Sequence, residues 1–75
     1  MLVRLYVGRG CHLCETARVL LERLQEELPF ELEEVDITGD PELERRHREF
    51  LPVVEVGGER ISVYRVDEAA LRARL

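Results

Sequence analysis

The chain contains two cysteines, Cys11 and Cys14, with His12 and Leu13 between them. They follow an apolar run from Leu2 to Val7 and precede a segment of helical periodicity, so they lie where a strand turns into a helix. A thiol at a helix N-terminus faces unpaired N–H groups and the positive end of the helix dipole, and both favour the thiolate. A spacing of three residues on a helical turn brings two sulfur atoms together. The pair therefore predicts either disulfide exchange or metal ligation.

Length and composition limit the class of protein. With 75 residues, 45% of them hydrophobic and 36% charged, the sequence predicts one small folded domain over residues 1–75. The 16 acidic residues outnumber the 11 basic ones, which gives a net charge of -5 at pH 7. This excess of negative charge argues against nucleic acid or an anionic membrane surface as the main partner.

No run in the sequence approaches the ~20 apolar residues needed to span a bilayer. The N-terminus also lacks the basic start and apolar stretch of a signal peptide. We therefore expect a cytoplasmic protein that does not engage a membrane. Thiols are kept reduced in the cytoplasm, so a close cysteine pair there favours metal binding or catalysis over a structural disulfide.

The elements around the cysteines follow from the apolar periodicity. The run from Leu2 to Val7 has the length of a buried strand and is bounded by glycines. After the cysteines, apolar residues recur at helical spacing until Pro29 ends the predicted helix. The apolar positions of this helix are Leu13, Ala17, Leu20, Leu21, Leu24 and Leu28. A second strand is predicted from Phe30 to Ile37.

A second helix is predicted to begin at Asp40 and Pro41, because aspartate caps helix N-termini and proline is favoured in the first turn. It carries Leu43, His47 and Phe50 along one stripe. This stripe assigns His47 a half-buried packing role, with metal ligation as the alternative. The opposite, solvated face is expected to hold Arg45, Arg46 and Arg48.

The last part of the chain predicts a hairpin followed by a helix. Two strand-like stretches, 53–56 and 60–64, flank Gly57 and Gly58, a pair typical of a tight two-residue turn. Asp67 then has the position of an N-cap for a final helix. The predicted order is strand, helix, strand, helix, hairpin, helix.

This order predicts an α/β fold, β-α-β-α-β-β-α, with one four-stranded mixed sheet, because the first crossover makes two strands parallel and the hairpin adds antiparallel strands. Three features narrow the fold further: the segment from Tyr6 to Cys14, the dipeptide Leu51-Pro52, and the aspartate Asp67 that opens the last helix. On these features the chain resembles the glutaredoxin-like family of the thioredoxin fold. The resemblance covers essentially all 75 residues.

The resemblance implies roles for individual residues. Cys11 corresponds to the exposed nucleophilic cysteine of the family, and Cys14 corresponds to the more buried resolving cysteine. Pro52 corresponds to a cis-proline beside the pair, and the backbone of Leu51 to the stretch that pairs with the main chain of a substrate. Arg9 lies near the position at which relatives hold a glutathione carboxylate with a basic residue.

Two departures from the family pattern bear on the substrate. Relatives that bind glutathione well carry a glycine pair before the final helix, where this chain has Tyr64 and Arg65. We expect these side chains to crowd the γ-glutamyl group, although Arg65 and the helix start at Asp67 attract carboxylates. The dipeptide His12-Leu13 also differs from the Pro-Tyr of glutaredoxins and the Gly-Pro of thioredoxins. His12 either lowers the thiol pKa of the pair or is an ordinary solvated residue.

The function expected from this pattern is thiol–disulfide exchange through a mixed disulfide. The expected substrates are disulfides of proteins or small molecules, and the electrons come from an external reductant, either glutathione or a reductase. No bound cofactor is required, and we expect a monomer. Two other functions stay open: zinc or iron–sulfur binding by the two thiolates with His12 or a second chain, and a redox-inactive adaptor that holds peptides beside Leu51 and Pro52.

Overall fold

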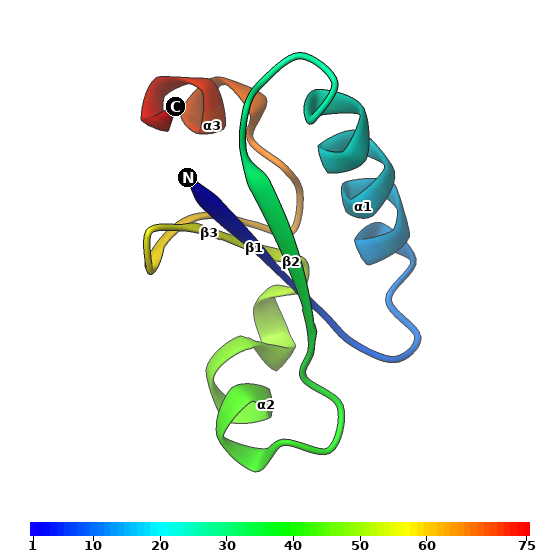
Figure 1. Ribbon diagram of the computed structural model, residues 1–75. Helices are drawn as coiled ribbons and strands as arrows, with labels where there is room; N and C mark the ends of the chain where they lie inside the picture. Colours follow the sequence, from blue (N-terminus) through cyan, green and yellow to red (C-terminus); the bar gives the residue numbers. More distant parts are fainter.

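A computed structural model describes residues 1–75 and arranges them as four strands, three α-helices and one short 3-10 helix (Figure 1). The order β-α-β-α-β-β-α is the one predicted from the sequence. The elements are β1 (Leu2–Val7), α1 (His12–Leu24), β2 (Glu31–Asp36), α2 (Pro41–His47), the 3-10 helix η1 (Arg48–Phe50), β3 (Val53–Val56), β4 (Glu59–Val63) and α3 (Glu68–Arg74).

The four strands form one mixed sheet with the order β2-β1-β3-β4. Strand β1 pairs in parallel with β2, so that Val7 lies beside Asp36 at the ends of the two strands. It pairs antiparallel with β3, where Tyr6 lies beside Val53. The predicted mixed sheet is therefore confirmed, and its central strand β1 leads directly into the turn that carries the cysteines.

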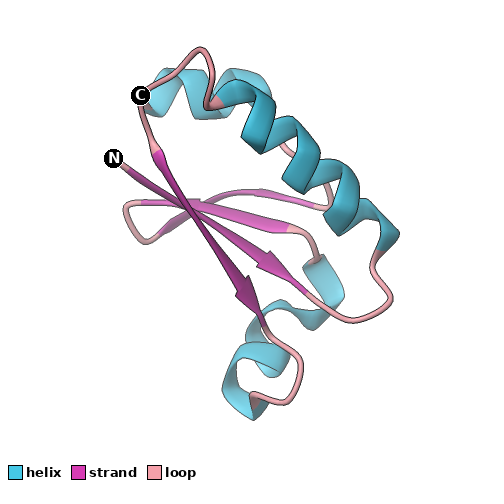
Figure 2. Ribbon diagram, turned by 45° about the vertical axis from the view of Figure 1, so that its right-hand side comes forward, coloured by secondary structure: helices cyan, strands magenta, loops and turns pink.

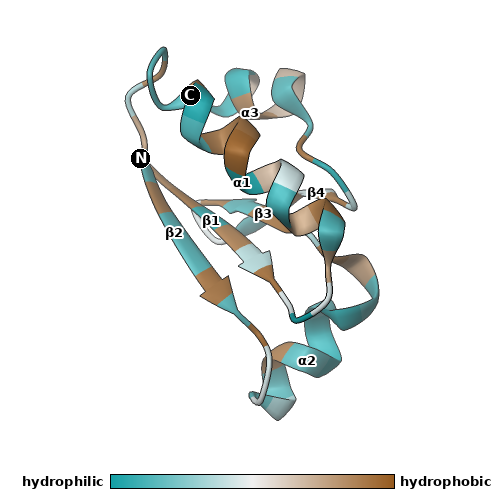
Figure 3. Cartoon of the chain, turned by 90° about the vertical axis from the view of Figure 1, so that its right-hand side faces the viewer, coloured by the Kyte–Doolittle hydropathy of each residue, from teal (hydrophilic) through white to brown (hydrophobic).

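Helices α1 and α3 lie together on one side of the sheet, and α2 lies at the end where β1 and β2 finish (Figure 2). The apolar core is built mainly from β1, β3 and the inward face of α1. Its fully buried members include Val3, Leu5, Leu21, Val54, Val56 and Leu71. The edge strand β2 is mostly hydrophilic (Figure 3), and its charged side chains protect the open edge against pairing with other strands.

A second, polar cluster is buried where α2 meets the sheet. The ring of His47 stacks on Tyr6 with 4.1 Å between ring centroids, and the Tyr6 hydroxyl donates a hydrogen bond to Glu55 Oε1 at 3.1 Å. His47 is only 1% exposed, so the packing role is confirmed but the burial is deeper than the predicted half-buried position. An Arg60 guanidinium nitrogen lies 3.0 Å from His47 Nδ1. Burial lowers the pKa of His47, and the positive charge of Arg60 acts in the same direction.

Helix α1 ends at Leu24, one turn before the predicted end at Leu28. Beyond this point, the N–H of Glu27 donates to the carbonyl of Leu24, three residues back, as in the tighter turns that finish many helices. Pro29 restricts Leu28, the residue before it, and so ends the turns that follow Leu24. The expectation that the helix continues to the proline was therefore wrong by one turn.

The hairpin and the helix caps have the predicted chemistry. Gly57 and Gly58 form the turn with positive φ angles of 61° and 84°, which a two-residue hairpin turn requires. Asp40 caps α2, and Asp67 caps α3 by accepting a hydrogen bond from the N–H of Ala70 at 3.0 Å. Strand β4 runs one residue earlier than predicted, from 59 to 63. None of the helices has the length and apolar character that a membrane crossing requires.

Candidate functional site

The turn between β1 and α1 places the cysteines. Gly10 has a φ of 76°, a conformation that glycine adopts without steric cost. The N–H of Cys11 donates a hydrogen bond to the carbonyl of Gly8 at 3.4 Å. Cys11 then takes the N-cap position of α1 with extended backbone angles, φ -95° and ψ 101°. The chain thus reverses from the sheet into the helix within a few residues, and Cys11 stands at the helix N-terminus as predicted.

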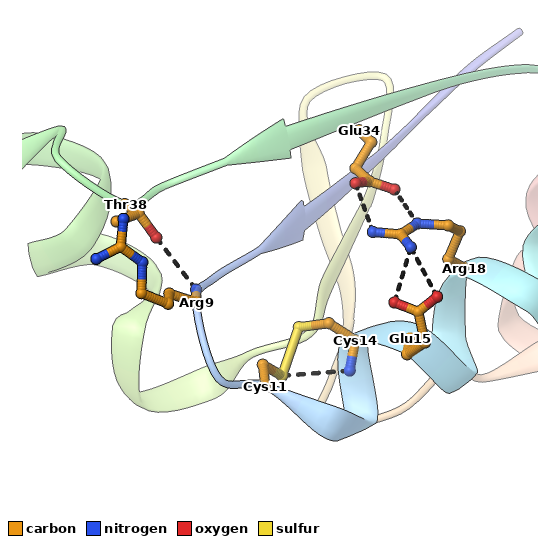
Figure 4. Close-up of a disulfide and its surroundings, with 7 residues drawn as sticks. All are labelled: Arg9, Cys11, Cys14, Glu15, Arg18, Glu34 and Thr38. Carbon is orange, nitrogen blue, oxygen red and sulfur yellow. Dashed lines mark hydrogen bonds and ion pairs between the residues drawn. A yellow bond between two sulfur atoms is a disulfide. The ribbon is translucent and has the colours of Figure 1, made fainter.

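Cys11 and Cys14 form a disulfide with their Cα atoms 5.4 Å apart (Figure 4). The Sγ atom of Cys11 accepts a hydrogen bond from the N–H of Cys14 at 3.2 Å. Cys11 is partly exposed, whereas Cys14 is 3% exposed and belongs to the apolar core. The two sulfur atoms therefore differ in access: one faces the surface at the helix start, and the other lies inside the first turn.

The dipeptide Leu51-Pro52 leads into β3, and its peptide bond is cis, as the resemblance implied. The side chain of Leu51 packs against Gly8, where an added Cβ would lie 2.6 Å from Leu51 Cδ1. The N–H of Tyr64 donates to the carbonyls of Phe50 and Pro52, at 3.0 and 2.9 Å. Leu51 itself lies outside the sheet ladders and takes no part in the backbone hydrogen bonds of the turns and loops. Its N–H and carbonyl have no partner within the chain.

A charged groove of about 350 Å³ opens beside the cysteines, between the start of α1 and the end of β2. Arg9, Cys11, His12 and Asp36 are among the residues that line it. The backbone N–H of Arg9 donates to Thr38 Oγ1 at 3.1 Å (Figure 4), which ties the cysteine turn to the loop after β2. The N–H of Thr38 holds the pKa of Asp36 below its ordinary value, and the charge of Arg9 adds to this effect.

One wall of the charged groove is an ion network that was not predicted from the sequence. Arg18 donates to both carboxylate oxygens of Glu15, at 2.8 and 2.7 Å, and to both of Glu34, at 2.6 and 2.8 Å (Figure 4). These bonds raise the pKa of Arg18, those to Glu34 most. The spacing of Glu15 and Arg18 on one helix could have signalled their pairing. No local signal connects α1 with Glu34 on β2, so the network as a whole depends on the folded sheet.

A second, apolar groove of about 110 Å³ lies on another side of α1, against the segment that precedes α3. It is lined by Leu13, Thr16, Ala17, Leu20, Tyr64, Arg65 and Val66. Tyr64 has a φ of 71°, in the left-handed region that disfavours bulky residues by roughly 1–2 kcal/mol. This backbone conformation also explains why β4 ends before Tyr64.

The structure therefore divides the predicted site residues among four places, one of which is the Leu51-Pro52 segment before β3. Arg9 and His12 line the charged groove together with the cysteines, whereas Arg65 lines the apolar groove. The carboxylate of Asp67 accepts a hydrogen bond from the N–H of Ala70 and so occupies the N-terminus of α3. No group of three or more histidine, cysteine, aspartate or glutamate side chains is arranged to hold a metal ion.

A four-stranded mixed sheet of this order, with a Cys-x-x-Cys disulfide at the N-terminus of the first helix, defines a thioredoxin-fold protein of the glutaredoxin-like type. The family model described as "Glutaredoxin-like domain (DUF836)" matches residues 2–75. The chain belongs to this family.

Individual relatives are similar along most of the chain. The chain is 36% identical over 76 residues to the uncharacterized proteins Rv0508 of Mycobacterium tuberculosis and Mb0520 of Mycobacterium bovis, covering 95% of this chain and 78% of each relative. The solution NMR structure of protein Ne2328 from Nitrosomonas europaea superposes with a TM-score of 0.84 at 33% identity. The superposition covers 97% of this chain and 88% of that one, so the similarity extends over the whole fold.

Proposed function

We propose that this chain is a thiol–disulfide oxidoreductase that reduces disulfides of proteins or small molecules through a mixed-disulfide intermediate. The observation that carries the proposal is the asymmetry of the cysteine pair. Cys11 is partly exposed and caps α1, whereas Cys14 is 3% exposed one turn further on. Membership of the glutaredoxin-like family supports the same chemistry.

In the first step, the Cys11 thiolate attacks one sulfur of the substrate disulfide. An S–S bond forms between Cys11 and that sulfur, and the other substrate sulfur leaves as a thiolate that takes a proton from solvent. The N–H of Cys14, which already donates to Cys11 Sγ at 3.2 Å, and the positive end of α1 stabilise the attacking thiolate. The position at the helix N-terminus therefore makes Cys11 the nucleophile.

In the second step, the Cys14 thiol loses its proton and attacks the sulfur of Cys11. The remaining substrate sulfur leaves, and the internal disulfide forms between cysteines whose Cα atoms are 5.4 Å apart, within the ordinary range for disulfides. Two electrons have then moved from the cysteine pair to the substrate. An external reductant, either glutathione or a reductase, returns them, and no bound cofactor takes part.

The substrate's main chain is proposed to pair with Leu51. The N–H and carbonyl of this residue have no partner within the chain, and an extended segment can use such groups as a further strand would. Arg9 and His12 line the charged groove with Cys11 and are the proposed polar contacts. Arg65, which lines the apolar groove, is the proposed contact for a substrate that extends toward α3.

Reduction of insulin disulfides, with dithiothreitol as the electron donor, tests the proposed function. The wild-type protein is expected to accelerate precipitation of the insulin B chain, and Cys11→Ser is expected to abolish the acceleration. Metal analysis of protein purified without chelator is run on the same preparation. One equivalent of zinc or iron without reductase activity would favour the metal-binding alternative. The absence of both bound metal and reductase activity would favour a redox-inactive adaptor.

A further inference from the structure

Tyr64 is the only residue other than glycine with a positive φ, at 71°. Its N–H is bonded to the carbonyls of Phe50 and Pro52, which fixes the backbone in this conformation. Glycine adopts such a conformation freely, whereas a bulky side chain is held there only against steric resistance. The tyrosine ring contacts Phe50, with 6.2 Å between the ring centroids, and is nevertheless 50% exposed, so much of its surface is left uncovered. A strained and exposed aromatic residue of this kind points to a use for the ring at the surface.

The ring borders the apolar groove, and Leu13 lies on the same groove. Away from the chain ends, three large apolar side chains are strongly exposed, namely Leu13 at 56%, Val19 at 51% and Tyr64 at 50%. Two of these three line this one groove, and five of its seven lining residues are hydrophobic. Leu13 and Tyr64 thus share one groove, whereas the third exposed side chain, Val19, lines another hollow on α1.

One lining residue of the apolar groove adjoins the reactive cysteines in the sequence. Leu13 stands between Cys11 and Cys14 in the sequence, at the first turn of α1. Tyr64 is hydrogen-bonded through its backbone to Pro52, next to the unpaired backbone of Leu51. Leu13 and Tyr64 are therefore each connected to a group that the proposed function assigns to the bound polypeptide, the thiol of Cys11 and the backbone of Leu51.

The size of the groove indicates what it holds. Its volume of about 110 Å³ is below the ~150 Å³ of a cavity that accepts benzene, and well below the ~300–1,000 Å³ of ordinary small-molecule sites. A single aliphatic side chain fits a space of this size, whereas a whole tripeptide such as glutathione does not. The apolar lining favours a hydrocarbon side chain over a polar one.

We propose that Leu13 and Tyr64 are specificity-determining residues, which hold an apolar side chain next to the substrate's reactive cysteine. The preferred substrates are then polypeptide disulfides in which an apolar residue adjoins the cysteine. This inference rests on the proposed oxidoreductase function and names the substrate class for it.

Two peptide disulfides test the inference. They are homodimers of one short peptide, identical except that leucine or serine flanks the cysteine on both sides. We expect wild-type kcat/KM to be about tenfold higher for the leucine peptide, in the range that a few apolar groups contribute to discrimination. Tyr64→Gly and Leu13→Ser are each expected to reduce this preference to about twofold, mainly by slowing reduction of the leucine peptide.

Two control variants separate the groove from general effects. Val19→Ser removes an equally exposed apolar side chain from the same helix and is expected to keep the tenfold preference. Tyr64→Phe keeps the aromatic ring and is also expected to keep the tenfold preference. Equal kcat/KM for the two peptides with wild-type protein, or an unchanged preference in both Tyr64→Gly and Leu13→Ser, would overturn this inference while leaving the reductase function in place. If the wild-type protein reduces neither peptide, this inference and the proposed reductase function are both overturned.

Discussion

The Sγ atom of Cys11 accepts a hydrogen bond from the backbone N–H of Cys14 at 3.2 Å. In the reduced protein this N–H is available to a Cys11 thiolate, whereas Cys14 is 3% exposed and shielded by the core. We predict that iodoacetamide at neutral pH alkylates Cys11 faster than Cys14 by about tenfold or more. Mass mapping of partly labelled protein measures both rates. Equal rates, or earlier labelling of Cys14, would contradict the assignment, and in concentrated urea the rates should converge because the helix is lost.

Tyr64 and Arg65 predict poor use of glutathione. By the resemblance to glutathione-binding glutaredoxins, these side chains stand where a glycine pair is expected, and the groove beside them is too small for a tripeptide. In the glutathione-coupled hydroxyethyl-disulfide assay, we expect turnover at least about tenfold below that of dithiol glutaredoxins. The double variant Tyr64→Gly/Arg65→Gly should raise the rate, because the φ of 71° at position 64 suits glycine and the loop keeps its path.

The single variant Arg65→Gly distinguishes steric crowding by the Tyr64 ring from the effect of the Arg65 charge in the same assay. If crowding limits the rate, this variant gains little, because the tyrosine ring stays in place. A wild-type rate typical of dithiol glutaredoxins would refute the expected preference against glutathione.

Gly8 is predicted to be needed for the position of Leu51. A Cβ at residue 8 would lie 2.6 Å from Leu51 Cδ1, and the Leu51 side chain is buried, so it cannot move away without repacking. Gly8→Ala should lower the free energy of unfolding by roughly 1–3 kcal/mol, as measured by urea denaturation, and should slow disulfide reduction.

A double-mutant cycle with Leu51→Ala checks the cause. Leu51→Ala removes the clashing methyl group, so the double variant Gly8→Ala/Leu51→Ala should be clearly less destabilised than the sum of the single variants. Strict additivity would show that the two positions do not interact and that Gly8 matters for another reason.

Much of the fold could be predicted because its signals are local. The apolar run of β1, the Gly57-Gly58 turn and the aspartates at positions 40 and 67 each specify a strand, a turn or a cap through residues near one another in the sequence. The position of Cys11 at the start of α1 followed in the same way. The end of α1 was missed because the change to tighter turns after Leu24 leaves no mark in the apolar spacing, which continues to Leu28.

Features that depend on distant contacts were not predictable. The stack of Tyr6 on His47 joins residues far apart in the chain, so the depth at which the histidine is buried could not be read from local patterns. The left-handed conformation of Tyr64 runs against the preference of its residue type, and is held by carbonyls that precede β3. The apolar groove between Leu13 and Tyr64 therefore became visible only in the folded chain.

The buried His47 predicts a loss of stability in acid. Burial, together with the positive charges of Arg60 and Arg46, lowers its pKa in the folded protein below the ordinary 6.5. Below pH 6.5 the unfolded chain binds a proton that the folded chain does not, so the free energy of unfolding falls as the pH decreases toward the folded pKa. The loss is about 1.4 kcal/mol for each unit by which the two pKa values differ.

Urea denaturation of wild type and His47→Phe between pH 7 and pH 5 measures this effect. The phenylalanine keeps an aromatic ring against Tyr6 but does not titrate, so its stability should depend less on pH over this interval. His12→Ala, at an exposed histidine, is the matched control and should retain the wild-type dependence. Parallel curves for wild type and His47→Phe would contradict the prediction.

The most direct test of the cysteine chemistry is the mass spectrum of the reduced Cys14→Ser variant after incubation with a peptide disulfide. We predict that a mixed disulfide between the peptide and Cys11 accumulates, because the buried thiol that would release it is missing. The wild-type protein under the same conditions should instead yield free peptide and the Cys11–Cys14 disulfide. A Cys14→Ser variant that forms no mixed disulfide, or a Cys11→Ser variant that forms one through Cys14 equally fast, would contradict the proposed mechanism.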